Sequence, residues 1–213
     1  PEDRLAKWGS GLRILVRTEA PPQEFVVNTI QAFRAALPHA AHFRPISQLD
    51  WSDHAKVTDG DLVVFLTWRR GVPREAADQR LDALLGEVRG PEPSSQIEPV
   101  LGAPDDLRFV GVVRSAQGEV RRAIVVADLD YLQVGGQPAV LQSLATALNP
   151  NAGNAVYPGL PGSTPAEKRI YEKTWRSSVK YDLSWTPEFT VYLRTLLQDS
   201  VMPGMDVAQF SDA

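Results

Sequence analysis

One short, nearly uninterrupted apolar run constrains the fold of this sequence more than any other feature. Residues 61–67 read DLVVFLT, with five apolar side chains in succession. A strand with one face in water alternates apolar and polar residues, whereas a strand covered on both faces has no polar face. The run therefore predicts a strand that is buried on both sides, inside a layered structure.

The patterns around this run predict the other elements. We expect strands at residues 12–17, 41–49, 61–67, 109–114 and 121–127, and helices at residues 24–37, 74–88, 138–148, 165–177 and 186–199. Gln117-Gly118 between the last two strands is a hairpin signal. Residues 90–104 carry four prolines and are expected to form an irregular loop. The fold class is α/β (α+β), with a mixed sheet flanked by helices.

Length and composition suit one domain. The chain has 213 residues, of which 43% are hydrophobic, enough for a sizeable core. Residues 151–165 are rich in Gly, Pro and Asn, which is typical of an extended loop. We therefore predict an α/β core at residues 1–150, and a loop-rich extension at residues 151–213 whose C-terminal helix packs on the core.

The charge balance and the residue types that are absent exclude several functions. Lys and Arg total 22 against 26 Asp and Glu, a net charge of -4, and there is no basic run, which argues against nucleic acid as the partner. No apolar run reaches the roughly 20 residues of a membrane span. Cysteine is absent, which excludes disulfides, thiol catalysis and cysteine-bound metals. The lack of cysteine and a first residue, Pro1, that is not Met lead us to expect a processed, exported protein.

Two segments, residues 193–205 and residues 141–149, carry a resemblance to an uncharacterised family of exported bacterial proteins with a zincin-like fold related to metallopeptidases. Residues 193–205, LRTLLQDSVMPGM, are similar to the closing segment of that family, in which a helix runs into a Pro-Gly-Met turn. Residues 141–149, LQSLATALN, are similar to the helix on which the family places paired glutamates before a Gln-Ala-Leu-Gly sequence. The resemblance implies a zincin-like layout and a periplasmic or extracellular location.

This sequence departs from that family on the helix that would carry the catalytic residues. Gln142 and Ser143 stand where the family has its paired acids, Thr146 replaces its Gln, and Asn149 replaces its Gly. A working zincin needs two His four residues apart on one helix face with a Glu beside the first. Residues 138–148 contain neither His nor an acid, so the resemblance is to a degenerate form without the catalytic residues.

The sequence contains no other common catalytic motif in place of the zincin motif. There is no Gly-x-Ser-x-Gly elbow, no phosphate-binding glycine loop and no dinucleotide fingerprint. His39, His42 and His54 are the three histidines. His39 and His42 have workable ligand spacing, but we interpret them as part of a polar connection after a helix end. We predict no catalytic residue, no bound metal and no cofactor.

Paired carboxylates leave one enzymatic alternative open. Asp128 and Asp130 are expected to project from the same side of a strand end, and Asp105-Asp106 lies at the entrance of the hairpin. Such pairs act as acid and base when their pKa values are driven apart, or bind a metal. The alternative is therefore a metal-dependent, peptidase-like hydrolase that uses Asp128, Asp130 and a histidine.

Clustered aromatic residues favour a binding function instead. Tyr157, Tyr171, Trp175 and Trp185 lie in the last third of the chain among basic residues, and Trp68-Arg69 follows the buried strand. Trp, Tyr and Arg are the types that dominate protein interface hot spots. We predict a non-catalytic protein-binding or structural component of an exported assembly, with other protein subunits as partners. An extension that docks these aromatics onto its own domain stays open.

Replacing Trp175 with Ala separates these two roles. If Trp175 contacts a partner, Trp175→Ala weakens the association by about 2 kcal/mol and leaves the thermal stability of the chain nearly unchanged. Calorimetric binding and thermal melts of both forms measure this. Unfolding of the chain without any weaker association would show that the aromatic residues are merely structural.

Overall fold

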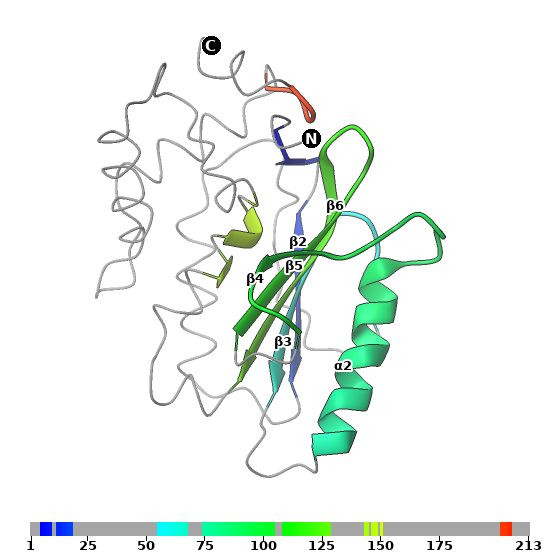
Figure 1. The fold of residues 1–213 in the computed structure, drawn as a ribbon, viewed down its shortest axis with the longest axis vertical. Coiled ribbons are helices and arrows are strands. Elements are labelled where there is room, and N and C mark those ends of the chain that lie inside the picture. The colour runs from blue at the N-terminus through cyan, green and yellow to red at the C-terminus, as the bar shows by residue number, and fades with distance from the viewer. Residues whose placement is uncertain are drawn as a thin grey trace, which may run out of the picture.

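The computed structural model describes residues 5–9, 12–18, 55–67, 74–104, 108–128, 143–144, 146–148, 150 and 201–205, and the observations below concern these residues. The described residues form one open sheet with a long helix, α2, along it (Figure 1). The protein is therefore a mixed α and β structure, as the patterns predict.

The sheet contains six described strands and is mixed. They are β1 (Lys7–Trp8), β2 (Arg13–Thr18), β3 (Asp61–Thr67), β4 (Glu98–Leu101), β5 (Arg108–Arg114) and β6 (Glu119–Asp128), and the helix is α2 (Arg74–Arg89). Their order is β2-β3-β6-β5-β4, and β1 pairs with the start of β6. β1, β2, β3 and β6 run parallel, while β5 is antiparallel to both β6 and β4.

β3 is the predicted strand that is buried on both faces. All seven of its residues are buried, because β2 and β6 flank it and structure covers both of its faces. On one face, Leu81, Leu84 and Val88 of α2 pack against the core cluster that contains Val63 and Phe65. Full burial of one such side chain contributes about 1.5–3 kcal/mol, so the contact between α2 and the sheet is a main source of stability.

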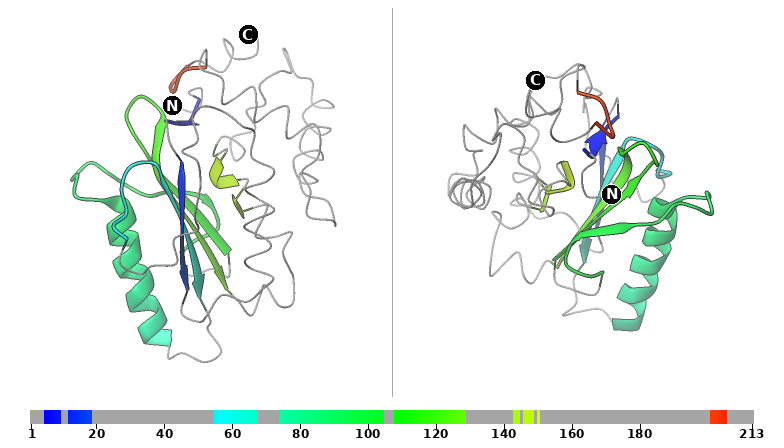
Figure 2. Two further views of the ribbon diagram at one scale, coloured as in Figure 1. Left: turned by 180° about the vertical axis from the view of Figure 1, so that it is seen from behind. Right: turned by 45° about the horizontal axis from the view of Figure 1, so that its top comes forward.

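The opposite face of the sheet is covered as well. The described residues between 143 and 148 are helical and lie on the side away from α2 (Figure 2). Leu144 and Leu148, which the sequence pattern places on one apolar stripe, are buried. The Trp8 indole donates a hydrogen bond to the carbonyl of Ala147 at 2.8 Å. This contact attaches β1 to the helical segment.

One sequence-based expectation was wrong. Residues 90–104 were expected to be an irregular loop because of their prolines, but they contain β4, which pairs with β5. Proline has no backbone N–H, yet an edge strand tolerates it because one side of the strand has no ladder partner. Pro99 occupies such an edge strand, and the register shifts between Pro99 and Leu101.

The remaining expectations divide into confirmed and untested ones. The strands at residues 12–17, 61–67, 109–114 and 121–127 and the helix at 74–88 are confirmed within two residues at either end. The two-residue β1 was not predicted, since it is too short to show a periodicity. The elements expected at residues 24–37, 41–49, 165–177 and 186–199 lie outside the described residues. The division into a core and an extension at residue 150 therefore stays a prediction.

The first and last described segments meet at the β5–β6 turn. The amide of Leu5 donates to the carbonyl of Met205 at 2.9 Å, and the amide of Gly204 donates to Leu5 at 2.8 Å. The amide of Lys7 donates to Gly118 at 3.1 Å, and the buried Lys7 ammonium donates to the carbonyl of Val201 at 2.6 Å. We call this three-way contact the terminal clasp.

Gly204 is required by the geometry of the clasp. Its φ is +74°, and a Cβ there would lie 2.2 Å from the carbonyl oxygen of Gln117. The Pro-Gly-Met sequence at residues 203–205 thus has a structural reason for its glycine. A side chain at this position would push the last segment away from the hairpin turn.

Gly204→Ala is expected to lower the free energy of unfolding by about 2 kcal/mol or more, since a positive φ alone costs about 1–2 kcal/mol and the overlap with Gln117 adds to it. The matched control is Gly86→Ala inside α2, where a new Cβ meets nothing within 4 Å. That change is expected to add about 0.5–1 kcal/mol of stability. Urea unfolding of both variants measures the difference, and equal stabilities would contradict the packing of the clasp.

Candidate functional site

The carboxyl ends of the parallel strands are the first place to look for a site, because ligands of α/β sheets bind there. Thr67 ends β3 and is paired in register with Asp128 at the end of β6. Both are buried, with Asp128 only 1% exposed. Asp130, Asp105, Asp106 and the three histidines lie outside the described residues. Within the described ranges, no three His, Asp or Glu residues gather as metal ligands.

The predicted partner-binding residues also fall outside the described part of the chain. These are Trp68, Arg69, Tyr157, Tyr171, Trp175 and Trp185. Of the four positions that correspond to the motif of the exported family, Ser143 and Thr146 are described. Ser143 is fully buried and Thr146 is half-buried on the helical segment behind the sheet.

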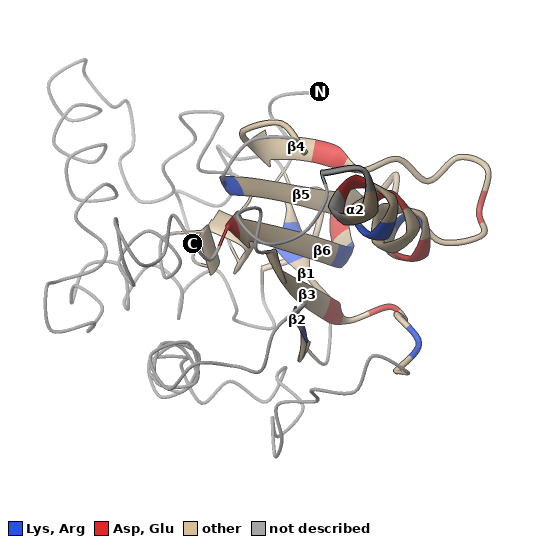
Figure 3. Cartoon of the chain, turned by 90° about the horizontal axis from the view of Figure 1, so that it is seen from below, with Lys and Arg blue, Asp and Glu red and all other residues tan. Residues whose placement is uncertain are grey.

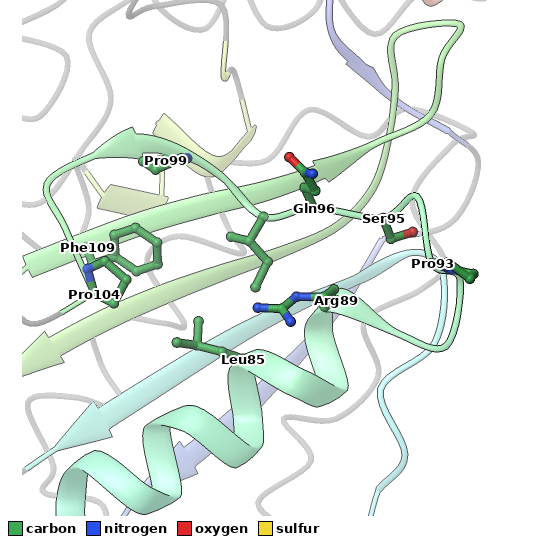
Figure 4. A pocket seen from close by; sticks show the side chains of 9 residues that line it. Leu85, Arg89, Pro93, Ser95, Gln96, Pro99, Pro104 and Phe109 are labelled. Carbon is green, nitrogen blue, oxygen red and sulfur yellow. The ribbon is translucent and has the colours of Figure 1, made fainter.

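A pocket opens between α2 and the β4–β5 pair, and none of its residues was singled out from the sequence. Its volume is about 480 Å³, within the range of about 300–1,000 Å³ of ligand sites. Leu85 and Arg89 come from α2, and Phe109 comes from β5 (Figure 4). The rest of the lining lies between α2 and β5: Pro93, Ser95, Gln96, Ile97, Pro99 and Pro104. The described lining therefore mixes apolar side chains with Arg89, Ser95 and Gln96, and the surface that faces the pocket is more polar than apolar.

The shape of the pocket follows from two glycines. A Cβ at Gly111 would lie 2.5 Å from Cγ2 of Ile97 and 2.7 Å from Cζ of Phe109, so these side chains pack directly on the backbone of β5. Gly90 ends α2 with a φ of +77°, and its amide donates to Gly86 at 3.1 Å. The chain then turns away from the helix axis, which leaves the space between α2 and β4.

Nearby carboxylates are already paired with arginines. Glu98 of β4 forms an ion pair with Arg114 of β5. Glu92 accepts from Arg121 at 2.6 Å, and Arg121 also contacts Asp59 at 2.8 Å. The hydrogen bond from Arg121 holds the pKa of Glu92 below its ordinary value, and the same bond raises the pKa of Arg121. Glu92 and Glu98 are thus paired with arginines that are not among the described lining residues.

Arg89 differs from these arginines. It is exposed at the last position of α2, and it makes no ion pair with any residue that the structure describes. Its side chain lines the pocket at the end of α2, as does that of Leu85 one turn earlier (Figure 4). The pocket thus combines the partly exposed apolar side chains of Leu85 and Ile97 with one cation that no described carboxylate neutralises.

The other charged residues act on the structure rather than on the pocket. β3, β4, β5 and β6 carry their charged residues at their ends (Figure 3). Arg13 of β2 binds both carboxylate oxygens of the fully buried Asp61 at 2.8 Å, and the amide of Thr58 donates to the same carboxylate at 2.7 Å. Two parallel bonds fix the geometry of such a pair. They align the starts of β2 and β3.

Comparisons with known protein families, with curated proteins and with solved structures find no match to this chain. Within the described residues, no helix is both long and apolar enough to cross a bilayer. The function must therefore be argued from the geometry.

Sequence reasoning missed the pocket because it treated the proline-rich stretch as a loop. The signal that could have revealed it is the segment 96–101, QIEPVL, in which apolar residues surround a single proline. A strand predicted at residues 96–101, together with the predicted helix at 74–88, would have placed the apolar side chains of this segment near Arg89.

The contact between Glu92 and Arg121 predicts that the stability of the fold depends on pH. A lowered carboxyl pKa contributes stability that is present above the ordinary value of 4.5 and is lost as the pH falls through the folded pKa. Arg121→Gln is expected to raise the pKa of Glu92, while Arg89→Gln, the control, leaves it unchanged. Carboxyl ¹³C NMR titration measures both. A Glu92 that titrates at 4.5 in the unmutated chain would contradict the contact.

Proposed function

We propose that this chain is a non-catalytic protein-binding domain, and that the pocket between α2 and the β4–β5 pair is one surface that holds its partner. The observation that carries the proposal is Arg89, a cation without a partner among the described residues, in a pocket that the partly exposed Leu85 and Ile97 also line. Arginine and large apolar side chains are enriched at the centres of protein interfaces. A concave site that joins apolar groups to a few polar ones is a common form of binding site.

The lining of the pocket does not supply the parts of a catalytic site. An active site needs a nucleophile or base with a partner that orients it. Among the described lining residues, Ser95 alone has a hydroxyl, and its Oγ hydrogen-bonds the Glu92 carboxylate at 3.3 Å. None of these described residues carries an imidazole or a carboxylate. The hydrolase alternative with Asp128, Asp130 and a histidine draws no support from the described residues.

The wider setting is part of the same proposal. A zincin-like layout without catalytic residues, a place in an exported assembly, and aromatic contacts from residues 157–185 all rest on the sequence. A periplasmic or extracellular location is tested by fractionation of the source cells. Mature chain in the cytosol, from a gene without a signal segment, would overturn the proposed location.

Site-specific photo-crosslinking in the native cells tests the binding surface. A photoreactive residue in place of Gln96, at the pocket, is expected to give one discrete adduct with another protein. The same residue in place of Asp82, exposed on α2 and outside the lining, is the control and is expected to give none. Adding Arg89→Ala should abolish the adduct, because loss of a central arginine costs about 2 kcal/mol. Equal adducts from both positions, or none from Gln96, would refute the proposed surface.

A further inference from the structure

The chemistry of the partner can be read from the one unneutralised charge in the pocket. Arg89 presents a planar guanidinium with several N–H donors, a geometry that matches a carboxylate through two parallel hydrogen bonds. Glu92 and Glu98 neighbour the lining in the sequence, but they are paired with Arg121 and Arg114. The charge that complements the pocket is therefore negative, and the described residues do not supply it.

The floor of the pocket selects an apolar group next to that charge. Ile97 packs over Gly111 and Leu85 comes from the facing helix, and both are partly exposed, whereas Phe109 beside Gly111 is buried. Water in contact with such a surface is displaced favourably by an apolar side chain, at about 25 cal/mol per Å². A small inorganic anion would satisfy Arg89 and leave the floor uncovered. A carboxylate joined to an apolar body satisfies both.

The edge of β4 argues for recognition through side chains rather than through an added strand. Strand addition requires a regular row of backbone N–H and C=O groups along a free edge. Pro99 has no N–H, and the register of β4 shifts between Pro99 and Leu101. Both features are ways in which proteins protect edge strands from pairing. A bound segment would then be held by its side chains in the pocket.

We propose that the pocket between α2 and the β4–β5 pair binds a segment of a partner protein in which an acidic residue stands next to a large apolar one. The carboxylate pairs with Arg89, and the apolar side chain lies against the partly exposed Leu85 and Ile97. This inference rests on the proposed protein-binding function and specifies the partner's chemistry.

Two short peptides that differ in one charge test the inference on the full chain. The probe is N-acetyl-Glu-Phe-amide, and its neutral match is N-acetyl-Gln-Phe-amide. In ¹⁵N NMR titrations, the acidic peptide is expected to shift the amides of Arg89, Ile97 and Phe109 in a saturable way. Its affinity should exceed that of the neutral peptide about tenfold, the size of a charge-assisted hydrogen bond. Added salt should reduce the difference, because Arg89 is exposed.

Variants of the chain test whether Arg89 causes the difference in affinity between the two peptides. Arg89→Gln is expected to bind both peptides equally, at the affinity of the neutral one, and Arg89→Lys to recover part of the difference. The matched control is Lys56→Gln, which removes an exposed cation outside the lining and should leave the tenfold preference intact. Because Arg89 is exposed at the end of α2 and Gln is a good helix former, the variant keeps the fold, which the NMR spectrum itself verifies.

The outcomes separate this inference from the proposed function. Equal binding of both peptides to the unmutated chain, or binding of neither, overturns acidic recognition, while a protein adduct from Gln96 would still support the protein-binding function. Arg89-dependent binding of the acidic peptide without any protein adduct overturns the partner protein as the source, and leaves a site for a free amphiphilic carboxylate. Arg89-dependent binding together with the adduct supports both.

Discussion

The burial of β3 on both faces is the constraint on which the rest of the described structure depends. A strand of seven buried residues requires neighbours on both sides and a cover on both faces. β2 and β6 supply the neighbours in parallel register, and α2 supplies the cover on one face through Leu81, Leu84 and Val88. Since parallel strands need long crossover connections, the chain between β3 and β6 has room for α2 and the β4–β5 pair.

That arrangement explains why the pocket lies where it does. α2 packs over the centre of the sheet, and β4 is the strand at the edge beyond β5. Arg89 in the last turn of α2 and Pro99 of β4 both line the pocket. Gly90 follows the last residue of α2, so the helix does not extend across the pocket. Gly111 has no side chain, so Ile97 and Phe109 pack directly on the backbone of β5. The pocket is a consequence of helix length and of two residues without side chains.

Several charged residues hold the sheet together, and Arg89 takes no part in these described contacts. Arg13 with Asp61 aligns two strand starts, and Arg121 with Glu92 ties the loop after α2 to β6. The buried pair has a partner for each charge, which is the condition under which proteins tolerate charges in the interior. Arg89 lies outside these networks, and for that reason it is the cation through which we expect the pocket to act.

The sequence by itself determined the elements whose signal is local. The unbroken apolar run of β3, the Gln117-Gly118 turn and the helical spacing of α2 each follow from the period of their side chains, and all three are present. β4 and the pocket were decided only by the tertiary structure. Pro99 argues against a strand until β5 is placed beside it, with no described strand on its other side. Likewise, Arg89 is one of many surface arginines until the tertiary structure places it on the same pocket as Ile97 and Phe109, residues that no sequence period relates.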